Sequence, residues 1–376
     1  MKSDSVWSTP EAHLCKMQPD TAQLYFCPAQ LQATARRFQA GFGGLVSYAV
    51  KANPARVVLD NLVAAGLRAF DVASVPEMQA VRAACPQAVL HYNNPVRSRV
   101  EVAQAAALGI ASASVDCAGE LEKLSVLPRG TEISVRLALP VRGAAYDFGA
   151  KFGAGPDQAV ALLRQVAQMG FTPAMTFHPG TQCTDAGAWA SYIHACADVA
   201  GRAQVRLARL NVGGGFAAHR GGDAPDLEAV FDRIADETRA AFGADAPGLV
   251  CEPGRAMVAE ACHLAARVKS LRADAVYLND GIYGALAEWR DIAAHDRVRI
   301  VTTDGAQRCQ PPRPRIVFGP TCDSIDRLPD PVPLPGDLAE DDYVIFAGMG
   351  AYGSAIATRF NGYGPDAMVT VISLTA

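Results

Sequence analysis

The chain has 376 residues, of which 50% are apolar and 19% are charged, and its formal net charge is −4. This length allows two domains with a large core, and the composition is that of an ordinary globular protein. The charge does not support a nucleic-acid-binding surface, and no apolar stretch approaches the length of a membrane span. The N-terminus lacks the apolar core of a signal peptide, and the ten cysteines are scattered without a CxxC pair. We therefore expect a cytoplasmic protein with reduced thiols, no nucleic-acid or membrane partner and no metal site.

The first 26 residues are expected to be irregular apart from a strand at Gln23–Cys27, and a helix is predicted at Pro28–Ala40. After the glycine-rich breaker at 41–44, eight short apolar runs alternate with longer segments of helical periodicity. The predicted strands are Leu45–Val50, Arg68–Val72, Ala88–Tyr92, Ala113–Val115, Ile133–Leu139, Ala174–Phe177, Arg209–Val212 and Leu249–Cys251. The predicted helices between them are Ala55–Ala65, Val75–Ala84, Val96–Leu108, Asp157–Met169, Ala186–Ala200 and Leu227–Phe242.

This alternation predicts an α/β fold in which eight strands close a (β/α)8 TIM barrel. A doubly wound sheet is the competing fold, but a dinucleotide site needs GxGxxG after its first strand, and Tyr48–Pro54 contains no glycine. From about residue 262 onward, short β-rich runs separated by proline and glycine predict a C-terminal all-β domain. These runs are Val276–Leu278, Val298–Thr302, Arg315–Phe318, Tyr343–Phe346 and Met368–Leu374, with loops at Pro311–Pro314 and Leu328–Gly336. We thus expect the barrel at 27–262 and a β-rich domain made of 1–26 and 263–376.

A barrel keeps its functional groups in the loops that follow the carboxyl ends of its strands. Polar residues of this sequence collect at those positions: Lys51, Asp71, Asn93–Asn94, His178, Gly213–Gly215 and Glu252–Arg255. Lys51 directly follows an apolar strand and precedes an Asn-Pro turn. It is either a strand-end lysine that extends to water or an amine nucleophile that can form a Schiff base with an aldehyde cofactor.

Three glycines after the seventh strand leave backbone N–H groups free to face an anion, and Arg255 after the eighth strand would add a charged fork. These two loops form the recurrent phosphate site of barrel enzymes, although an isolated glycine run is more often a flexible turn. A phosphate-anchored aldehyde on a lysine describes pyridoxal 5′-phosphate, whose ring nitrogen needs an acidic partner that Glu252 can supply. His178 can stack on such a ring and the Thr181 hydroxyl can reach its phosphate. The alternatives are a capping glutamate and a structural histidine.

Ten segments of the sequence resemble the ornithine/lysine/diaminopimelate decarboxylase family of pyridoxal phosphate enzymes, and ornithine decarboxylases most closely. They are Tyr48–Asn53, Phe70–Ser74, Lys151–Gly153, His178–Gln182, Gly213–Phe216, Glu252–Arg255, Asn279–Gly284, Gly319–Ser324, Gly350–Tyr352 and Phe360–Gly362. The resemblance runs in order from about residue 24 to the C-terminus. It implies an alanine-racemase-like barrel of fold type III with a β domain, and the activity of an amino-acid carboxy-lyase.

The resemblance also implies roles for single residues. Lys51 would carry the cofactor, Glu252 would pair with the ring nitrogen, and His178 would stack on the ring. The phosphate and the polar network around the lysine would be held by Asp71, Arg136, Thr181, Gly213, Gly214, Gly215, Gly254, Arg255 and Tyr352. Cys322 would return a proton to the α-carbon. Family members are homodimers in which Cys322 and Asp323 enter the neighbouring subunit's site, so that two half-sites would make one active site.

The expected substrate is a basic L-amino acid. Asp323 is a short carboxylate that can bind a distal ammonium group, with Tyr283 and Phe360 as further substrate-binding residues. In the family an aspartate at this position goes with ornithine or lysine. Diaminopimelate enzymes carry an Arg-Pro-x-x-Tyr segment where this chain has Asp280–Tyr283. We therefore expect conversion of L-ornithine to putrescine, as in polyamine biosynthesis, with conversion of L-lysine to cadaverine close behind.

Other interpretations of the sequence stay open. Glu288 or Asp291 is expected to be a second carboxylate for the distal amine. HPGTQ at 178–182 replaces the commoner HVGSQ, and Gly353 stands where a serine is usual, which would suit another diamino acid of a specialised pathway. A racemase on the same barrel would need a catalytic tyrosine opposite Lys51. A non-catalytic regulatory relative would be expected to lack the lysine, the cysteine or the phosphate ligands, all of which this chain keeps.

Overall fold

The computed structural model describes residues 6–140, 151–291, 293–294, 296–365 and 368–375. Its internal contacts divide the chain into two compact units. The barrel unit comprises Thr34–Ala217 and Pro225–Met257, and the β unit comprises Met1–Ala33, Ala218–Ala224 and Val258–Ala376. The domain boundaries expected at residues 27 and 262 stay predictions.

The barrel unit is a closed parallel barrel in which each strand pairs with the next and the last returns to the first. Its strands are β2 (Leu45–Ala49), β3 (Ala69–Val72), β4 (Val89–Tyr92), β5 (Ser112–Val115), β6 (Glu132–Arg136), β7 (Thr172–Thr176), β8 (Arg209–Asn211) and β9 (Gly248–Cys251). Leu45 and Val46 of β2 pair with Val250 and Cys251 of β9, which closes the ring. The predicted fold class and the eight predicted barrel strands are therefore confirmed, with end points that shift by a few residues.

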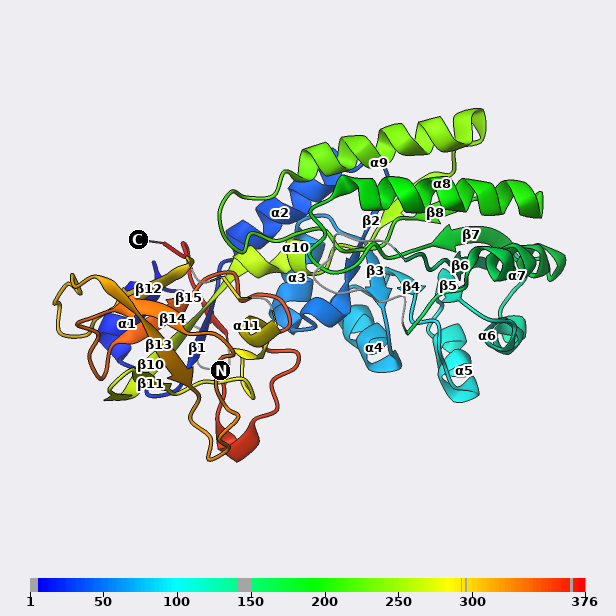
Figure 1. The fold of residues 1–376 in the computed structure, drawn as a ribbon. Coiled ribbons are helices and arrows are strands. Elements are labelled where there is room, and N and C mark those ends of the chain that lie inside the picture. Colours follow the sequence, from blue (N-terminus) through cyan, green and yellow to red (C-terminus); the bar gives the residue numbers. More distant parts are fainter. Residues whose placement is uncertain (1–5, 141–150, 292, 295, 366–367, 376) are drawn as a thin grey trace. The chain divides into compact units, whose positions relative to one another are not determined.

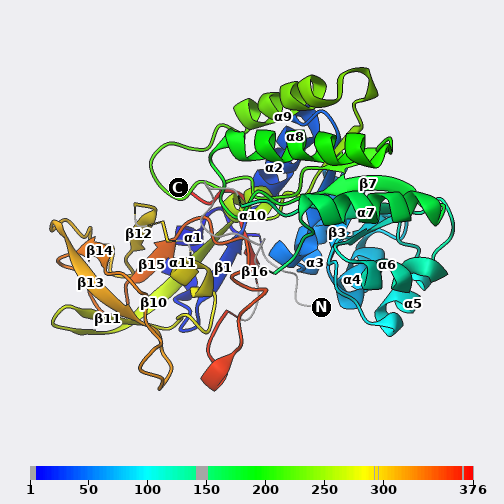
Figure 2. The ribbon, with the colours of Figure 1, turned by 45° about the vertical axis from the view of Figure 1, so that its right-hand side comes forward.

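Helices alternate with these strands and surround the barrel. They are α2 (Pro28–Gly41), α3 (Arg56–Ala64), α4 (Val75–Ala84), α5 (Arg99–Ala107), α6 (Ala118–Lys123), α7 (Pro156–Gln168), α8 (Ala186–Ala203) and α9 (Leu227–Phe242). In two views α2, α8 and α9 lie side by side (Figure 1 and Figure 2). The rings of Phe38, Trp189, Phe216 and Phe231 pack there, with neighbouring centroids 5.2 to 5.7 Å apart. No helix in the described part of the chain combines the length and apolar character that crossing a membrane requires.

Capping side chains fix where the barrel helices begin. The Ser74 hydroxyl accepts a hydrogen bond from the Glu77 N–H, and the Glu77 carboxylate accepts one from the Ala73 N–H at 2.7 Å. At the start of α5, Ser98 and Glu101 form a full capping box, in which the side chain of each accepts from the backbone N–H of the other. Such pairs satisfy N–H groups that a helix leaves without partners. They therefore keep the loops after β3 and β4, which carry polar residues, at a defined length.

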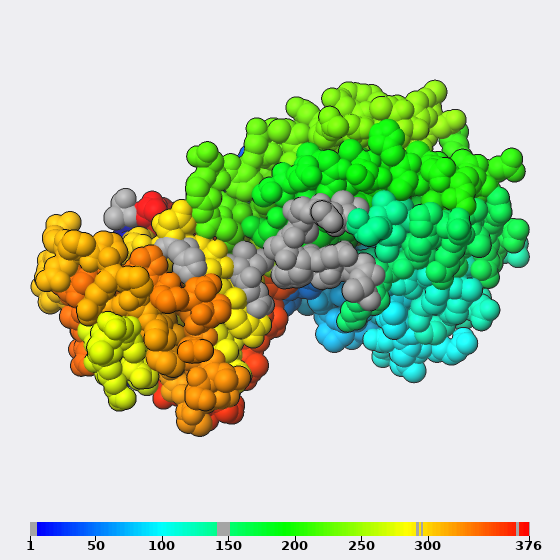
Figure 3. Space-filling view, viewed as in Figure 1, coloured from blue at the N-terminus to red at the C-terminus, as the bar shows by residue number. Residues whose placement is uncertain are grey.

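The β unit is built on a sheet with the order β12-β15-β10-β11-β13-β14, with β1 beside β10 and β16 beside β1. Its strands are β1 (Gln23–Phe26), β10 (Cys262–Arg272), β11 (Ala275–Leu278), β12 (Val298–Val301), β13 (Pro312–Phe318), β14 (Val332–Pro335), β15 (Tyr343–Phe346) and β16 (Met368–Thr370). Its helices include α1 (Pro10–Met17) and α11 (Ala287–Asp291). Leu264, Val276, Trp289 and Phe346 are fully buried in its core. The surface over β11, β13 and β14 appears in yellow and orange in Figure 3.

Several elements of the β unit differ from the prediction. The helix α1 lies in the segment that was expected to be irregular. The strand β10 is absent from the predicted strands, because its first residues are all buried and show no alternation of apolar and polar side chains. Pro311–Pro314 and Leu328–Gly336 are not simply loops, since they overlap β13 and β14. Pro312 stands opposite Pro335. In an antiparallel ladder every second pair of residues exchanges no N–H···O bonds, so prolines, which lack an N–H, can occupy such pairs.

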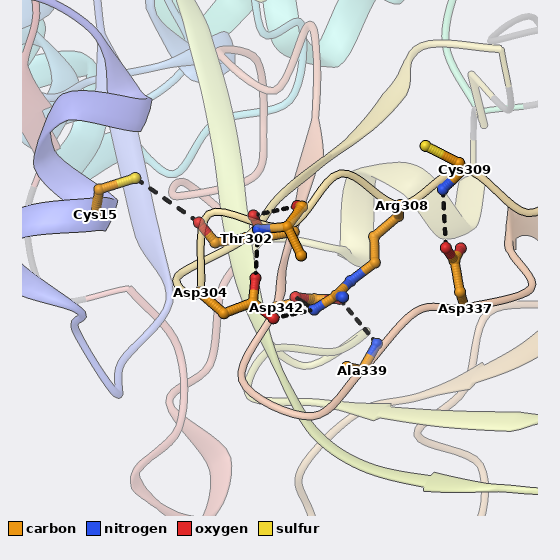
Figure 4. Close-up of polar contacts among 9 residues, drawn as sticks. Cys15, Thr302, Asp304, Arg308, Cys309, Asp337, Ala339 and Asp342 are labelled. Carbon is orange, nitrogen blue, oxygen red and sulfur yellow. Dashed lines mark hydrogen bonds and ion pairs between the residues drawn. The ribbon is translucent and has the colours of Figure 1, made fainter.

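An arginine in the β unit joins the loop after β12 to the turn before β15 (Figure 4). Arg308 donates from Nε and Nη2 to the two oxygens of Asp342, at 2.8 and 2.7 Å, and from Nη2 to Asp304 at 3.1 Å. Asp342 is only 1% exposed and also accepts from the Ala339 N–H at 2.8 Å. The hydrogen bond to Asp342 is the largest cause of the raised pKa of Arg308. The bidentate pair thus fixes two loops that are far apart in sequence.

Candidate active site

The barrel unit contains a cavity of about 240 Å³. Five residues that the sequence analysis expects at the site line it: Lys51, Asp71, Arg136, His178 and Glu252. The other lining residues are Ala73, Asn93, Asn94, Pro95, Lys151, Phe152, Thr176 and Phe177. Most of these residues stand at or just after the carboxyl ends of barrel strands, which is where barrel enzymes keep their reactive groups.

Lys51 is the middle residue of the 3-10 turn η1 (Val50–Ala52), which directly follows β2. Asn53 fixes the end of this turn. Its N–H donates to the Val50 carbonyl at 3.0 Å, its carbonyl accepts from the Tyr48 hydroxyl at 3.1 Å, and its side-chain oxygen accepts from the Ala55 N–H at 3.1 Å. The Lys51 side chain is exposed and lines the cavity, so its amine is accessible to a bound molecule.

Glu252 follows β9 and is held by two asparagines from other strands. Asn93, after β4, donates from Nδ2 to Oε1 of Glu252 at 2.5 Å, and Asn211, the last residue of β8, donates to the same oxygen. The Glu252 N–H donates to the Gly213 carbonyl at 2.8 Å. The backbone and one carboxylate oxygen are therefore both fixed, and the carboxylate keeps a defined direction at the cavity wall.

Asp71 and Glu252 are a pair of carboxylates on one cavity. Burial raises the pKa of Asp71 well above its usual range and the nearby Glu252 charge raises it further, whereas Lys51 and a hydrogen bond from Asn93 act in the opposite direction. Burial also raises the pKa of Glu252, against the hydrogen bond from Asn211 and the charge of Lys51. Two carboxylates that are disfavoured as neighbouring anions suit a bound group that carries positive charge.

His178 is a neutral imidazole in this site. Burial lowers its pKa well below the usual range, and the positive charges of Lys51 and Arg136 lower it further. Its Nδ1 accepts a hydrogen bond from the Gly180 N–H at 3.0 Å, so the single proton of the neutral ring is on Nε2. A Cβ at Gly214 would lie 3.3 Å from that Nε2. The ring therefore stands directly beside the glycine turn.

The glycine turn, Gly213–Gly215, has a shape that other residues cannot adopt without strain. Gly213 and Gly215 have φ angles of 70° and 86°, which side chains disfavour. A Cβ at Gly213 would lie 2.1 Å from the Phe177 carbonyl oxygen, and one at Gly215 would lie 2.3 Å from the Gly180 carbonyl oxygen. The backbone of the turn thus packs against the loop that carries His178, with no room for side chains.

One asparagine connects the glycine turn to the carboxylate. The Oδ1 atom of Asn211 accepts from the Gly213 N–H at 2.9 Å, while its Nδ2 atom donates to Glu252. Asn211 was not predicted from the sequence, and Asn93 was predicted at a strand end without a role. The signal that could have found Asn211 is a polar residue at the buried last position of the strand β8.

The other residues expected to bind phosphate in the barrel unit lie in the adjoining loops. Arg255 is buried at the start of α10 (Arg255–Val258), and Thr181 is buried beside the loop of His178. A Cβ at Gly254 would lie 3.2 Å from the Cβ atom of Ala52. The loop after β9 therefore packs against the turn that carries the lysine.

The remaining expected site residues lie in the β unit. Tyr283 donates its hydroxyl proton to Oδ2 of Asp323 at 2.6 Å, and its ring lies 5.0 Å from that of Phe360. The hydrogen bond from Tyr283 lowers the pKa of Asp323, so this carboxylate is ionised at neutral pH. Cys322 is exposed, and it lines, with Asp323, a second hollow of about 430 Å³.

A buried carboxylate holds this cluster together. Asp326 accepts hydrogen bonds from the Thr321 N–H at 3.0 Å, the Thr321 hydroxyl at 2.7 Å and the Ile282 N–H at 3.0 Å. These bonds join the turn of Cys322 to the loop of Tyr283. Asp326 was not predicted from the sequence, because its link to Ile282 joins residues 44 positions apart along the chain.

Three further predicted residues have different surroundings. Tyr352 is half-buried in the β unit with a φ angle of 60°. Glu288 is buried and accepts from Nη2 of Arg220 at 2.7 Å, so its charge is already balanced inside the β unit. Asp291 is the last residue of α11, and its side chain lies outside the part that the structure describes. Within the described ranges, no group of three or more histidines, cysteines or acidic residues could hold a metal ion.

Residues 28–259 match the model of a family described as "Pyridoxal-dependent decarboxylase, pyridoxal binding domain". The decarboxylase flvG of Aspergillus flavus is 30% identical over 349 residues, which cover 85% of this chain and 78% of that relative. The ornithine decarboxylase of Panagrellus redivivus is 30% identical over 342 residues, which cover 84% of this chain and 77% of that relative.

A solved structure is similar over almost the whole length. The lysine/ornithine decarboxylase of Vibrio vulnificus, complexed with cadaverine, has a TM-score of 0.82 and 26% identity. The similarity covers 96% of this chain and 97% of that one. It therefore includes both the barrel unit and the β unit.

Proposed function

Since the chain belongs to the family of pyridoxal-dependent decarboxylases, we propose that it releases CO₂ from a basic L-amino acid, with L-ornithine preferred and L-lysine next. The observation that carries this proposal is the barrel cavity, where an exposed lysine, two carboxylates and a neutral imidazole face one space. The product formed from L-ornithine would be putrescine.

Pyridoxal 5′-phosphate fits the barrel unit on three counts. Lys51 offers an accessible amine for its aldehyde. The carboxylates of Asp71 and Glu252 are buried near each other, which raises the pKa of both. A protonated ring nitrogen bound beside them would bring the positive charge that stabilises their ionised forms. The glycine turn has no side chains that would cover the backbone N–H groups of Gly214 and Gly215, which could face a phosphate, whereas the Gly213 N–H already donates to Asn211. When bound, the cofactor supplies an electron-accepting ring that stabilises the electron pair left by the departing CO₂.

The residues of the barrel unit then divide into positioning and charge roles. Lys51 would hold the cofactor, and Glu252 would keep its ring nitrogen protonated. His178 would stack on the cofactor ring. Because its imidazole is uncharged, it would not compete with the ring nitrogen for the negative charges of Asp71 and Glu252. Arg136 would add positive charge close to Asp71 and Glu252. The phosphate would be bound by the remaining candidates: Thr181, Gly213, Gly214, Gly215, Gly254, Arg255 and Tyr352.

The cluster in the β unit would supply the proton and the substrate contact. Cys322, an exposed thiol, would give the proton that replaces CO₂ on the α-carbon. Asp323, whose pKa the hydrogen bond from Tyr283 lowers further, would bind the distal ammonium group of the substrate. Phe360 packs on Tyr283 and would cover the methylene chain between the two amines. A carboxylate in this role selects a basic amino acid.

A homodimer with shared sites is part of the proposal. Two large apolar side chains close to Cys322 are exposed: Ile325, three residues along the chain, to 62%, and Phe360, next to the Asn361 that contacts Cys322, to 42%. Apolar side chains grouped on a surface mark places where another protein surface packs. A second copy of the chain would cover them and receive Cys322 and Asp323 in its own barrel site.

We also propose a cytoplasmic location. All ten cysteines are free, and three of them are exposed. Exposed free thiols suit a reducing compartment, because an oxidising one would favour disulfide formation.

The proposal is tested by incubating the purified chain with pyridoxal 5′-phosphate and, one at a time, L-ornithine, L-lysine, L-arginine and meso-diaminopimelate. CO₂ release and the amine product are measured. We expect putrescine from L-ornithine at the highest kcat/KM and cadaverine from L-lysine at a lower one. A Lys51→Ala variant serves as the control and should form neither. Absence of CO₂ with every basic amino acid would overturn the proposed substrate class.

A further inference from the structure

An asparagine of the β unit reaches across to the exposed cysteine. Asn361 lies in the 3-10 turn η5 (Phe360–Gly362) with φ 53° and ψ 17°, a left-handed conformation that asparagine tolerates better than most residues. Its Oδ1 atom is 3.3 Å from the backbone nitrogen and 3.5 Å from the sulfur of Cys322, 39 residues away in sequence. One carboxamide oxygen therefore faces both hydrogen-bond donors of the cysteine.

The directions of these two hydrogen bonds follow from chemistry. The Cys322 N–H can only donate, so the atom that faces it must be the carboxamide oxygen rather than the nitrogen. The same oxygen can only accept from the sulfur, so the bond at 3.5 Å is S–H···O. This bond exists only while the thiol carries its proton. A bond to the protonated form stabilises that form over the thiolate.

We propose that Asn361 is a positioning residue that keeps the transferable proton on the Cys322 sulfur and fixes its direction. The inference rests on the proposed function, in which this thiol supplies the proton that replaces CO₂. In that step the S–H bond breaks and a C–H bond forms with the electron pair left on the α-carbon. The sulfur keeps its own electron pair as a thiolate and regains a proton from solvent. The carboxamide oxygen, which repels a thiolate, favours that return.

A purely structural role for Asn361 makes a different prediction. If the carboxamide only braced the turn through the Cys322 N–H, its removal would leave the balance between thiol and thiolate unchanged. The charged groups that line the same hollow are Lys269, Arg272, Asp323 and Asp326. These four residues are the same in every variant at position 361. A change in the reactivity of the Cys322 thiol can therefore be attributed to the loss of the Asn361 carboxamide.

The test is site-resolved alkylation of the full-length holoenzyme by iodoacetamide at one fixed pH, followed by mass spectrometry, because only the thiolate reacts. Asn361→Gly keeps the left-handed backbone and removes the acceptor. We expect it to speed alkylation of Cys322 about fivefold, the factor that corresponds to a hydrogen bond worth about 1 kcal/mol. Asn361→Asp keeps the acceptor oxygen and adds negative charge, so it should be alkylated no faster than the wild type. Cys15 and Cys309, both exposed, serve as internal references.

The outcomes separate the inference from its premise. An unchanged Cys322 rate in Asn361→Gly would overturn the inference, and so would a parallel rise at all three cysteines, which would mean a loosened fold. The measurement needs no substrate. A chain that released no CO₂ but showed the expected order of alkylation rates would therefore refute the proposed function and leave the pairing of thiol and carboxamide intact.

Discussion

Single side chains in the barrel unit owe their chemistry to partners from other strands. Glu252 is a carboxylate in a poorly solvated site, and its burial raises its pKa. The hydrogen bonds from Asn93 and Asn211 oppose that effect and orient the group. A carboxylate held in this way can respond strongly to a positive ring nitrogen, because little water screens the interaction.

Replacing Glu252 by glutamine keeps the shape of the side chain and removes its charge. We expect kcat for CO₂ release from L-ornithine to fall about 10²-fold or more, because a neutral amide does not keep the ring nitrogen protonated. Steady-state kinetics of the holoenzyme measure this. Glu122→Gln, on the exposed face of α6, is the matched control and should leave kcat unchanged. A Glu252→Gln enzyme within twofold of the wild type would contradict the role given to this carboxylate.

His91 predicts a pH dependence of stability. It is buried in β4, its Nδ1 lies 2.7 Å from the Ser112 hydroxyl, and burial, followed by the charge of Arg209, lowers its pKa from 6.5 to about 4. The unfolded chain therefore binds this proton at a higher pH than the folded chain. The free energy of unfolding should be constant above pH 6.5 on this account, and should fall by up to about 3 kcal/mol as the pH drops towards 4.

Urea unfolding at pH 7.5 and pH 5 measures this effect. A His91→Gln variant should lose less stability between the two pH values than the wild type does. His194→Gln, at a ring on α8 that is 54% exposed and lies 2.7 Å from Glu237, should lose at least as much stability as the wild type. Equal losses in His91→Gln and the wild type would mean that other groups cause the acid sensitivity.

At the level of loops and strands, hydrogen bonds and ion pairs to buried carboxylates fix segments that periodicity leaves undefined. Asp326 ties the turn of Cys322 to the loop of Tyr283, and Arg308 ties two loops through Asp342. In both cases a buried carboxylate is matched by several donors. Removing one partner therefore costs more than the bond itself, because the remaining charge stays buried.

Arg308→Ala leaves the carboxylate of Asp342 buried without its guanidinium. We expect the free energy of unfolding of the β unit to fall by about 3–5 kcal/mol, measured by guanidinium chloride unfolding followed through tryptophan fluorescence. The double variant Arg308→Ala/Asp342→Asn should recover part of this loss, because it removes the unpaired charge. Arg313→Ala, at an exposed position of β13, should change stability little. A loss in Arg308→Ala no larger than in Arg313→Ala would contradict the prediction.

For the whole molecule, the proposed reaction needs groups from both units. Lys51 and Glu252 belong to the barrel unit, whereas Cys322 and Asp323 belong to the β unit. The proposal assigns the second pair to the site of a neighbouring copy, which would also cover the exposed Ile325 and Phe360. Activity would then depend on dimer formation and fall on dilution.

Mixing two inactive variants tests the sharing of sites. Lys51→Ala and Cys322→Ala should each be nearly inactive alone. After mixing and exchange of subunits, half of the dimers would be mixed, and each mixed dimer would have one intact site. Activity should therefore rise to roughly a quarter of the wild-type value. No recovery, with exchange shown by two differently tagged chains, would mean that each site is built from one chain.

The local pattern of the sequence was sufficient for the barrel and for the position of its reactive groups. Buried parallel strands are short apolar runs between amphipathic helices, and that signal found β2 to β9 in order. The rule that reactive groups follow the strands then brought together Lys51, Asp71, His178 and Glu252, which line one cavity in the structure. Periodicity indicates which residues are buried, and the geometry of a barrel brings the residues that follow its strands to one end.

What only the tertiary structure decided is which distant residues meet. Asn211 meets Glu252 across 41 residues, and Asn361 meets Cys322 across 39. The strand β10 was hidden because its buried half has no alternation, and β14 because its prolines are typical of loops. Hydrogen bonds and ion pairs of this kind depend on the register of strands and the close approach of loops, which no pattern of neighbouring residues encodes. Local sequence therefore specified the elements and the type of chemistry, whereas the fold selected the partners that tune each reactive group.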